Sequence, residues 1–399
     1  MNALDFFLLA AAVWFAIVGY RQGFVVGILS VIGFLGGGLL AVWVLPVLWD
    51  ALTDNSEAST TAVVVGVIVV IVCASTGQAF TTHLGNKLRT HITWSPARAL
   101  DATGGAVVNV LAMLLVAWLL GSLLAQTTLP TLGKQVRNSK VLLGVSQAMP
   151  QQADNWFSDF RSVLAQNGFP QVFSPFSNEP IKPVDPPDPA LANSQVARTA
   201  KQSIVKVVGT ASGCGKVLEG SGFVFAKDRV MTNAHVVGGV GEPTVQIGGQ
   251  GRRYDGTVVL YNWKRDIAVL DVPGLPAPSL RFTNGDAKAG DGAIVAGFPE
   301  NGDYDVRPAR VRSRITPTGP DIYHRGTVSR DVYSLYATVR QGNSGGPLLT
   351  TDGRVYGVVF AKSLDDPDTG YALTADEVRD DVTQGRTATQ RVDTESCAL

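Results

Sequence analysis

Four long apolar runs occupy the first third of the chain and constrain its fold more than any other feature. A helix of about 20 apolar residues spans the ~30 Å hydrocarbon core of a bilayer. Each run is near or above that length: Ala3–Tyr20, Gly23–Leu48, Thr61–Ala79 and Gly104–Leu124. Helices buried in a soluble core are the alternative, but four such runs in succession disfavour it. We therefore predict an N-terminal all-α domain of four transmembrane helices over residues 1–127.

The charges between the runs predict how the helices cross the membrane. The first loop carries Arg21, the third carries Lys87, Arg89 and Arg98, and the second holds Asp50, Asp54 and Glu57 with no Lys or Arg. The positive-inside rule places the basic first and third loops in the cytoplasm. The first run has neither a basic leader nor a small-residue cleavage site, so we expect a retained helix rather than a signal peptide. The prediction is a multi-pass inner (plasma) membrane protein whose C-terminal part is extracytoplasmic, in the periplasm.

Glycines in the second run predict close helix packing. Gly33 and Gly37 lie four residues apart, and helices in lipid associate where small residues let their backbones approach. A transport path is the alternative interpretation. Ionisable groups usually mark such a path, and among Asp, Glu, Lys and Arg only Asp5 lies inside one of the runs.

Residues 128–200 are predicted to form an extracytoplasmic linker. Asp154 is placed to cap a short helix whose apolar face carries Trp156, Phe157, Phe160 and Leu164. Seven prolines then follow between residues 170 and 189. Such density excludes helix and sheet, so we expect an extended, semi-rigid spacer.

Residues 201–399 change character and predict an all-β domain. Short apolar runs are separated by Gly, Pro, Asn and Asp, a pattern typical of sandwiches and barrels. The expected strands are Ile204–Val208, Gly222–Phe225, Thr257–Leu260, Ile267–Val272, Ala293–Ala296, Ser334–Val339 and Val355–Phe360. This length is sufficient for two small barrels with catalytic groups meeting at the cleft between them.

Three motifs in this half carry residues that acyl transfer by serine requires. His235 lies in the run 232–237, Asp266 begins the run 266–270, and Ser344 lies in the glycine-rich run 342–347. A serine hydroxyl is a poor nucleophile unless an imidazole takes its proton, and a buried carboxylate must orient that imidazole. Small residues around the serine let backbone amides point at one spot and bind an oxyanion. Each residue alone has a structural explanation, but the ordered set favours catalysis.

This half resembles a chymotrypsin-fold serine protease of the bacterial HtrA-like branch. The resemblance implies a double β-barrel and assigns His235 as the base, Asp266 as its orienting carboxylate and Ser344 as the nucleophile. It also implies that the backbone N–H groups of Gly342 and Ser344 form the oxyanion hole.

The same resemblance bears on specificity and regulation. It implies that Thr338 to Gln341 form one wall of the substrate pocket, so Thr338 and Gln341 are predicted substrate-binding residues. Because Thr338 is uncharged, a preference for Lys or Arg is not supported. Asn343 replaces the aspartate that pairs with a new N-terminus in the digestive proteases, which argues against that zymogen mechanism. Only 55 residues follow Ser344, so we expect no trailing PDZ domain.

The membrane half resembles the colicin V production family in Asp5, in the Arg21–Phe24 turn and in the glycine-rich second run. Together the halves resemble the actinobacterial membrane-anchored proteases associated with acid resistance. The resemblance implies an endopeptidase that cleaves periplasmic or cell-envelope proteins during acid stress. A catalytically silent peptide-binding scaffold and a protease-regulated transport protein are the alternatives.

The cysteines and the charge balance complete the expectations. Cys73 lies inside the third apolar run, whereas Cys214 and Cys397 are the only cysteines of the outward half. An oxidising compartment favours a disulfide between these two, and two free thiols are the alternative. No set of metal-ligating residues is visible, so no metal or cofactor is expected. The zero net charge gives no electrostatic argument for nucleic acid, which leaves peptide substrates and the lipid bilayer as predicted partners.

Overall fold

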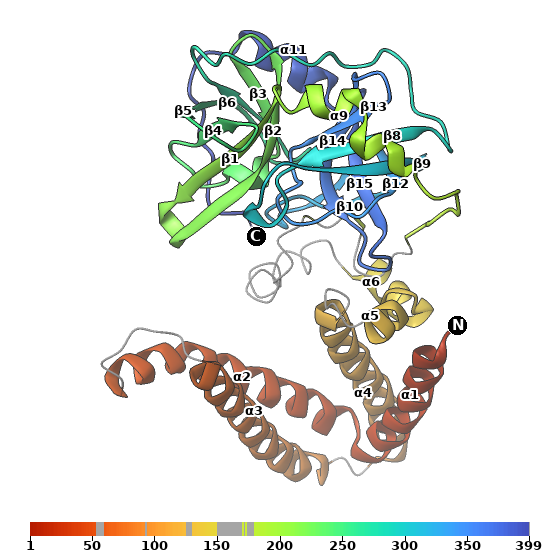
Figure 1. The fold of residues 1–399 in the computed structure, drawn as a ribbon. Helices are drawn as coiled ribbons and strands as arrows, with labels where there is room; N and C mark the ends of the chain where they lie inside the picture. Colours follow the sequence, from red (N-terminus) through yellow and green to blue (C-terminus); the bar gives the residue numbers. More distant parts are fainter. Residues whose placement is uncertain are drawn as a thin grey trace. The chain divides into compact units, whose positions relative to one another are not determined.

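The computed structural model describes residues 1–52, 60–91, 94–124, 130–149, 170, 172–173 and 179–398 (Figure 1). These residues form two compact units. Residues 1–122 and 138–148 belong to a helical unit, and residues 123–137 and 149–399 belong to a second, mainly β unit.

The helical unit contains long apolar helices, as predicted. Its helices are α1 (Ala3–Gln22), α2 (Phe24–Leu52), α3 (Thr60–Arg89), α4 (Ser95–Leu124) and the short α6 (Lys140–Ala148). Within the described residues, three helices are long and apolar enough to span a bilayer: Ala3–Gln22, Phe24–Ala41 and Ser95–Ser122. The remaining predicted span, Thr61–Ala79, lies in α3. The structure describes the side chains of α3 from residue 69 onward.

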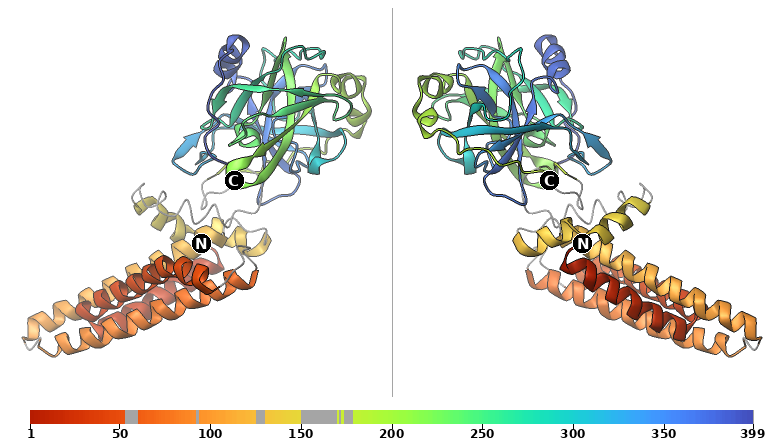
Figure 2. Two further views of the ribbon diagram at one scale, coloured as in Figure 1. Left: turned by 90° about the vertical axis from the view of Figure 1, so that its left-hand side faces the viewer. Right: turned by 90° about the vertical axis from the view of Figure 1, so that its right-hand side faces the viewer.

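Glycines allow α2 and α3 to pack backbone to backbone, which confirms the packing interpretation. A methyl group added to Gly33 would lie 2.0 Å from Thr81 Oγ1 and 2.4 Å from the Gly77 carbonyl oxygen. One added to Gly37 would lie 2.4 Å from the Cys73 carbonyl oxygen. The two helices run side by side in both views of Figure 2.

Asp5, the ionisable residue inside the first run, has a structural role. Asn2 and Asp5 form a capping box at the start of α1, with the Asp5 amide donating to Asn2 Oδ1 at 3.0 Å. The buried Asp5 carboxylate also accepts a hydrogen bond from Ser139 Oγ at 2.6 Å and from the Val141 amide at 3.2 Å. It therefore joins α1 to the start of α6.

The segment between the third and fourth apolar runs is largely helical, since α3 continues to Arg89 and α4 begins at Ser95. Arg89 Nε contacts Asp101 Oδ2 at 2.8 Å, and Asp101 Oδ1 accepts the Val25 amide at 3.1 Å. Asp101 of α4 thus bonds to both Arg89, at the end of α3, and Val25, at the start of α2. These bonds hold the ends of the three helices together.

Two antiparallel β structures form the second unit (Figure 1). The first is a seven-stranded sheet in the order β5-β4-β1-β2-β3-β7-β6, and the second is a closed barrel in the order β12-β15-β14-β13-β8-β9. The sheet strands are β1 (Ile204–Ala211), β2 (Lys216–Ala226), β3 (Arg229–Thr232), β4 (Thr244–Ile247), β5 (Arg253–Asp255), β6 (Thr257–Asn262) and β7 (Ile267–Asp271). The barrel strands are β8 (Gly292–Gly297), β9 (Asp305–Ile315), β12 (Val332–Tyr336), β13 (Pro347–Thr350), β14 (Val355–Lys362) and β15 (Thr369–Thr374).

Short elements connect and flank these strands. A hairpin of β10 (Thr318–Pro320) and β11 (Thr327–Ser329) extends from the barrel. The helical elements are α5 (Pro130–Arg137), η1 (Pro189–Asn193), α9 (Gln195–Ala200), η2 (Ser212–Cys214), α10 (Ala234–Val237), η3 (Pro299–Asn301) and α11 (Arg379–Thr387). The all-β prediction for this half is confirmed.

One apolar core lies across both β structures. Phe223 and Ile267 of the sheet share a buried cluster with Ile294, Val358 and Phe360 of the barrel. Burial of apolar side chains is the main favourable term in folding, so this cluster makes the sheet and the barrel pack as one body. Residues placed at their junction are thereby held at fixed positions.

The proline-rich part of the linker is extended where the structure describes it. Residues 179–188 have no regular secondary structure, in agreement with the proline density. The helix expected after Asp154 lies outside the described residues. Contrary to the expectation of a simple spacer, the linker residues Arg137 and Glu179 bond to the barrel, as described below.

Candidate active site

The three motif residues lie at ends of strands of the second unit. His235 is in α10, which starts two residues after β3; Asp266 immediately precedes β7; and Ser344 lies in the turn before β13. β3 and β7 pair as antiparallel neighbours, with Thr232 opposite Ala268. α10 and the turn before β7 therefore lie at the same end of this strand pair, which brings His235 and Asp266 together.

The imidazole of His235 is held by the Asp266 carboxylate. Nδ1 lies 2.8 Å from Oδ2 and 3.0 Å from Oδ1, and the His235 backbone amide donates to Oδ1 at 2.9 Å. Asp266 is fully buried and His235 is 7% exposed. A hydrogen on Nδ1 is required to donate to the carboxylate, so Nε2 is the ring atom left free to accept a proton.

The serine turn packs directly against the histidine segment. The Ser221 amide donates to the Ser344 carbonyl at 2.8 Å. Gly345 has a φ of 83°, and a methyl group there would lie 2.4 Å from Thr232 Oγ1 and 3.0 Å from the Asn233 nitrogen. Only glycine fits this close approach and left-handed backbone. The structure thus brings Ser344 to the same place as His235 and Asp266.

Ser344 Oγ is oriented toward the barrel in this structure. It donates to the Phe360 carbonyl at 3.5 Å, and no hydrogen bond joins it to His235 Nε2 among the interactions of these described residues. Contacts between catalytic groups are often long without substrate and tighten in the complex. To bond with His235 Nε2, the Ser344 side chain would have to rotate away from the Phe360 carbonyl.

Backbone amides around Ser344 divide into two groups. The amides of Asn343, Gly345 and Gly346 donate to carbonyl groups of the protein. Those of Gly342 and Ser344 are not among the donors in the hydrogen bonds found for the described residues, which leaves them available for an oxyanion. Gly342 has a φ of 92°, and its Cβ position would lie 2.3 Å from the Phe298 carbonyl oxygen, so this turn also requires glycine.

Asn343 stabilises the same turn from inside. Its side chain is 1% exposed, and Oδ1 accepts the Arg340 amide at 2.9 Å. Asn343 therefore bonds within its own turn, where the digestive proteases use an aspartate.

The predicted substrate-binding residues lie at the entrance to this turn. Thr338 Oγ1 donates to Asp368 Oδ1 at 3.2 Å, and the carbonyl of the exposed Gln341 accepts the Glu300 amide at 2.7 Å. Asp368, which comes from the loop before β15, was not singled out from the sequence. It adds a carboxylate beside the uncharged Thr338.

Two further buried residues near the site were missed in the sequence. Asn233 Nδ2 donates to the Asp266 carbonyl at 2.7 Å and so fixes Asp266, whose φ is 64°. Arg330 Nε donates to the Lys264 carbonyl at 2.9 Å, and its Nη1 donates to the Pro320 carbonyl at 3.1 Å. Arg330 therefore ties the segment before Asp266 to the β10 region. The position of Asn233 two residues before the histidine was the only available signal.

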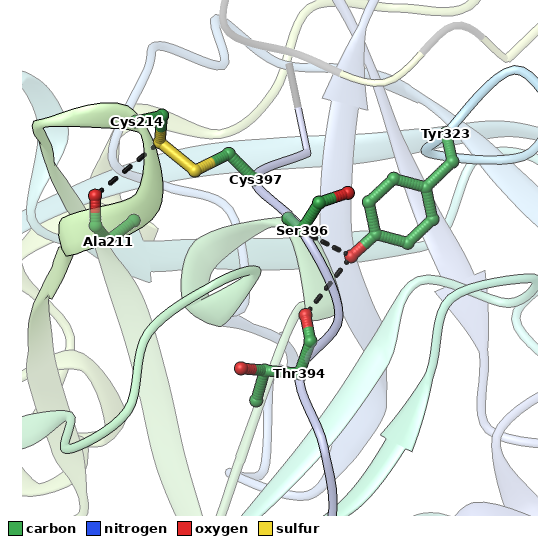
Figure 3. The surroundings of a disulfide bond; sticks show 6 residues. All are labelled: Ala211, Cys214, Tyr323, Thr394, Ser396 and Cys397. Carbon is green, nitrogen blue, oxygen red and sulfur yellow. Dashed lines mark hydrogen bonds between the residues drawn. A yellow bond between two sulfur atoms is a disulfide. The ribbon is translucent and has the colours of Figure 1, made fainter.

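The predicted disulfide is present (Figure 3). Cys214 and Cys397 are bonded, with their Cα atoms 6.5 Å apart and 183 positions apart in sequence. Tyr323 Oη donates to the Ser396 carbonyl at 2.8 Å, and burial raises the pKa of Tyr323 to about 12, so its hydroxyl stays protonated. Ala398 shares a buried cluster with Ala234 and Ile322, which places the bonded tail next to His235.

A metal site is not formed within the described part of the chain. No group of three or more His, Cys, Asp and Glu side chains there is arranged to hold an ion.

Comparison with known proteins assigns both halves to families. Residues 4–150 match the colicin V production protein family, and residues 220–358 match the trypsin-like peptidase domain. Serine protease Rv3671c of Mycobacterium tuberculosis is 39% identical over 396 residues, which cover 99% of this chain and 98% of that protein. A DegP-like periplasmic serine endoprotease of Halomonas elongata is 34% identical over 170 residues, or 40% of this chain and 34% of the other.

A solved structure gives the same assignment for the second unit. The active form of the Rv3671c protease from M. tuberculosis matches 57% of this chain and 100% of its own, with 46% identity and a TM-score of 0.54. The 39% identity to Rv3671c over 99% of this chain establishes common descent. The chain therefore belongs to the HtrA-like serine proteases that join a colicin V production domain to a trypsin-like peptidase domain, and it is a serine endopeptidase.

Proposed function

We propose that this endopeptidase uses His235, Asp266 and Ser344 as its catalytic triad. The observation that carries the proposal is the buried His235–Asp266 pair, bonded at 2.8 Å, with the Ser344 turn packed against the same segment. This arrangement leaves Nε2 as a base, and the triad chemistry needs that tautomer.

The reaction follows from these positions. Ser344 Oγ attacks the carbonyl carbon of the scissile peptide while its proton moves to His235 Nε2. The Gly342 and Ser344 amides stabilise the resulting oxyanion. The imidazolium, stabilised by Asp266, then gives its proton to the leaving amine, and an acyl-enzyme remains. Water deprotonated by His235 hydrolyses that ester and restores the free serine.

The substrates are proposed to be proteins of the periplasm or the cell envelope. Four spans in residues 1–127 would tether the peptidase domain, residues 201–399, outside the membrane through the linker 128–200. The alternation of basic and acidic loops supports this orientation. The Cys214–Cys397 disulfide also fits an oxidising compartment, and the DegP-like relative is named as periplasmic.

A role in tolerance of acid stress is part of the same proposal. It rests on the joint resemblance of the two halves to membrane-anchored proteases with that association. Thr338 and Gln341 are proposed to contact the substrate side chain next to the scissile bond.

Turnover by purified full-length protein tests the triad. With a fluorogenic peptide as substrate, Ser344→Ala and His235→Ala should each lower kcat by on the order of 10⁴-fold or more, because triad members act as a unit. Ser279→Ala changes an exposed serine and should retain full activity. Substantial turnover by Ser344→Ala protein would contradict the assignment.

A further inference from the structure

The linker residue Glu179 accepts hydrogen bonds from the loop that follows β14 and from β15. Its Oε2 accepts hydrogen bonds from Ser363 Oγ and from Tyr371 Oη at 3.3 Å, and its Oε1 accepts the Leu364 amide at 3.2 Å. Three donors on one partly buried carboxylate make a specific contact, since hydrogen bonds to an ionised acceptor are the strong ones.

Two other linker residues contact this loop and the neighbouring strand β15. Arg137 Nη2 lies 2.5 Å from Asp365 Oδ1, with side chains only 4% and 8% exposed, and the same nitrogen donates to the Leu364 carbonyl at 3.3 Å. The Phe173 ring packs edge-on against Tyr371, with ring centroids 5.6 Å apart. Linker residues separated by about 40 positions therefore converge on one loop, which a passive spacer would not require.

Hydrogen bonds connect this loop to Thr338, in the proposed wall of the substrate pocket (Thr338 to Gln341). Ser363 Oγ accepts the amides of Asp365 and Asp366, each at 3.0 Å. Asp366 Oδ1 accepts the Asp368 amide at 3.1 Å, and Asp368 Oδ1 accepts Thr338 Oγ1 at 3.2 Å. The loop that hydrogen-bonds to Glu179 therefore also holds Thr338 in position.

The loop is also joined to the nucleophile by the strand before it. β14 contains Phe360, whose carbonyl accepts Ser344 Oγ at 3.5 Å, and Ser363 follows three residues later. A shift of the loop would therefore displace Thr338 more than Ser344. Strand pairing of β14 with β13 and β15 restrains the site of the nucleophile itself.

We propose that Glu179 is a positioning residue for the peptidase, which orders the loop 363–369 and so forms the wall for the substrate side chain. The proposal rests on the proposed function of Ser344 and Thr338. It makes the linker part of the substrate-binding site, and it assigns to Glu179 an effect on substrate affinity rather than on bond cleavage.

The surroundings of Glu179 give the proposal a pH signature. Burial is the largest effect and raises the pKa of Glu179, the negative charge of Asp365 acts in the same direction, and Ser363, Leu364 and Arg137 oppose it. As the pH falls through that raised pKa, one oxygen gains a proton and ceases to accept a hydrogen bond. The hydrogen bonds between Glu179 and the loop should then weaken, and the KM for the peptide substrate should rise at acid pH.

Peptide kinetics on the full-length protein test the proposal. At neutral pH, Glu179→Ala should raise KM about tenfold or more, the factor that follows from losing hydrogen bonds to a charged acceptor, with kcat nearly unchanged. Glu179→Gln keeps the shape but lacks the charge, so its KM should lie between those of the wild type and Glu179→Ala. Asp185→Ala, an exposed acidic residue of the same linker, should behave as wild type.

The pH dependence and active-site labelling separate the outcomes. The KM ratio of Glu179→Gln to wild type should approach one at acid pH, because the wild-type carboxyl is then neutral as well. A small fluorophosphonate should label Ser344 in both variants at nearly the wild-type rate. Unchanged KM in both variants, or a ratio that does not vary with pH, would overturn the proposal. Failure of the wild type to label would instead count against the catalytic role of Ser344.

Discussion

At the scale of single residues, Asp266 carries out two tasks at once. One oxygen orients the His235 ring while the other also binds the backbone amide of His235. Its own backbone adopts a left-handed conformation, with φ at 64°, which costs free energy for a residue other than glycine. The Asn233 side chain stabilises that conformation through the Asp266 carbonyl.

Asn233 should therefore matter for activity although it does not touch the substrate. Replacing it with alanine leaves the buried Asp266 carbonyl without this donor, a loss of about 1–3 kcal/mol. We expect Asn233→Ala to lower kcat/KM by roughly 10- to 100-fold, the factor equivalent to that free energy, and to lower the melting temperature. Asn284→Ala, at an exposed position, is the control; equal activity of the two variants would contradict this role.

The sequence marked some residues of the candidate site and not others for a physical reason. His235, Asp266 and Ser344 lie within short motifs whose neighbouring residues shape the local turns. Glu179, Asp368 and Arg330 act through contacts between segments far apart in the chain, and no local pattern marks such residues. Thr338 was identified only by resemblance, and the hydrogen bond to Asp368 gives it a physical context.

At the scale of elements, local patterns predicted the long helices and part of the strands, but not the buried strands β3, β13 and β15. The expected runs Thr257–Leu260 and Val355–Phe360 lie within β6 and β14. β9 was missed because its eleven residues include Pro308 and four arginines, and it is partly exposed along much of its length. Its pairing with β8 and β12 in the closed barrel compensates for the weak local preference.

Helix packing in the helical unit gives a prediction at this scale. Gly33→Leu would force a side chain against the Thr81 side chain and the Gly77 carbonyl of α3, and overpacking typically costs about 1–3 kcal/mol. The variant should have a lower melting temperature in detergent than the wild type. Gly36→Leu is a matched control, because nothing lies within 4 Å of a Cβ there. If both variants melt alike, the α2–α3 glycine contact is unimportant for stability.

At the scale of the whole molecule, the chain joins apolar helices, long enough to span a bilayer, to a second unit that contains the candidate active site and a disulfide. In the proposed topology, the orientation of the helices across the membrane decides the compartment in which the second unit lies.

Reporter fusions test that orientation. An alkaline phosphatase fused after residue 128 should be active, because the predicted topology places it outside the cytoplasm. A fusion in the loop after Arg89 should be inactive, since positive charges retain that loop inside. The reversed pattern would contradict an extracytoplasmic peptidase.

The disulfide should couple stability to activity. Closing a loop of 183 residues stabilises by about 4–5 kcal/mol in the chain-entropy model, and the bonded tail packs beside Ala234 and Ile322 near His235. We expect Cys214→Ser, or a reducing agent, to lower both the melting temperature and the hydrolysis rate. Cys73→Ser removes the free cysteine of α3 and should change neither quantity. Free thiols at both Cys214 and Cys397 in exported protein would refute this coupling.

The central claim is that His235 activates Ser344 as a nucleophile, and covalent labelling tests it most directly. Full-length protein treated with a fluorophosphonate, followed by peptide mapping, should carry one phosphonyl group on Ser344. Labelling should be absent in Ser344→Ala and slowed by orders of magnitude in His235→Ala, because the hydroxyl then lacks its base. Equal labelling of the wild type and Ser344→Ala, or modification at another residue, would contradict the claim.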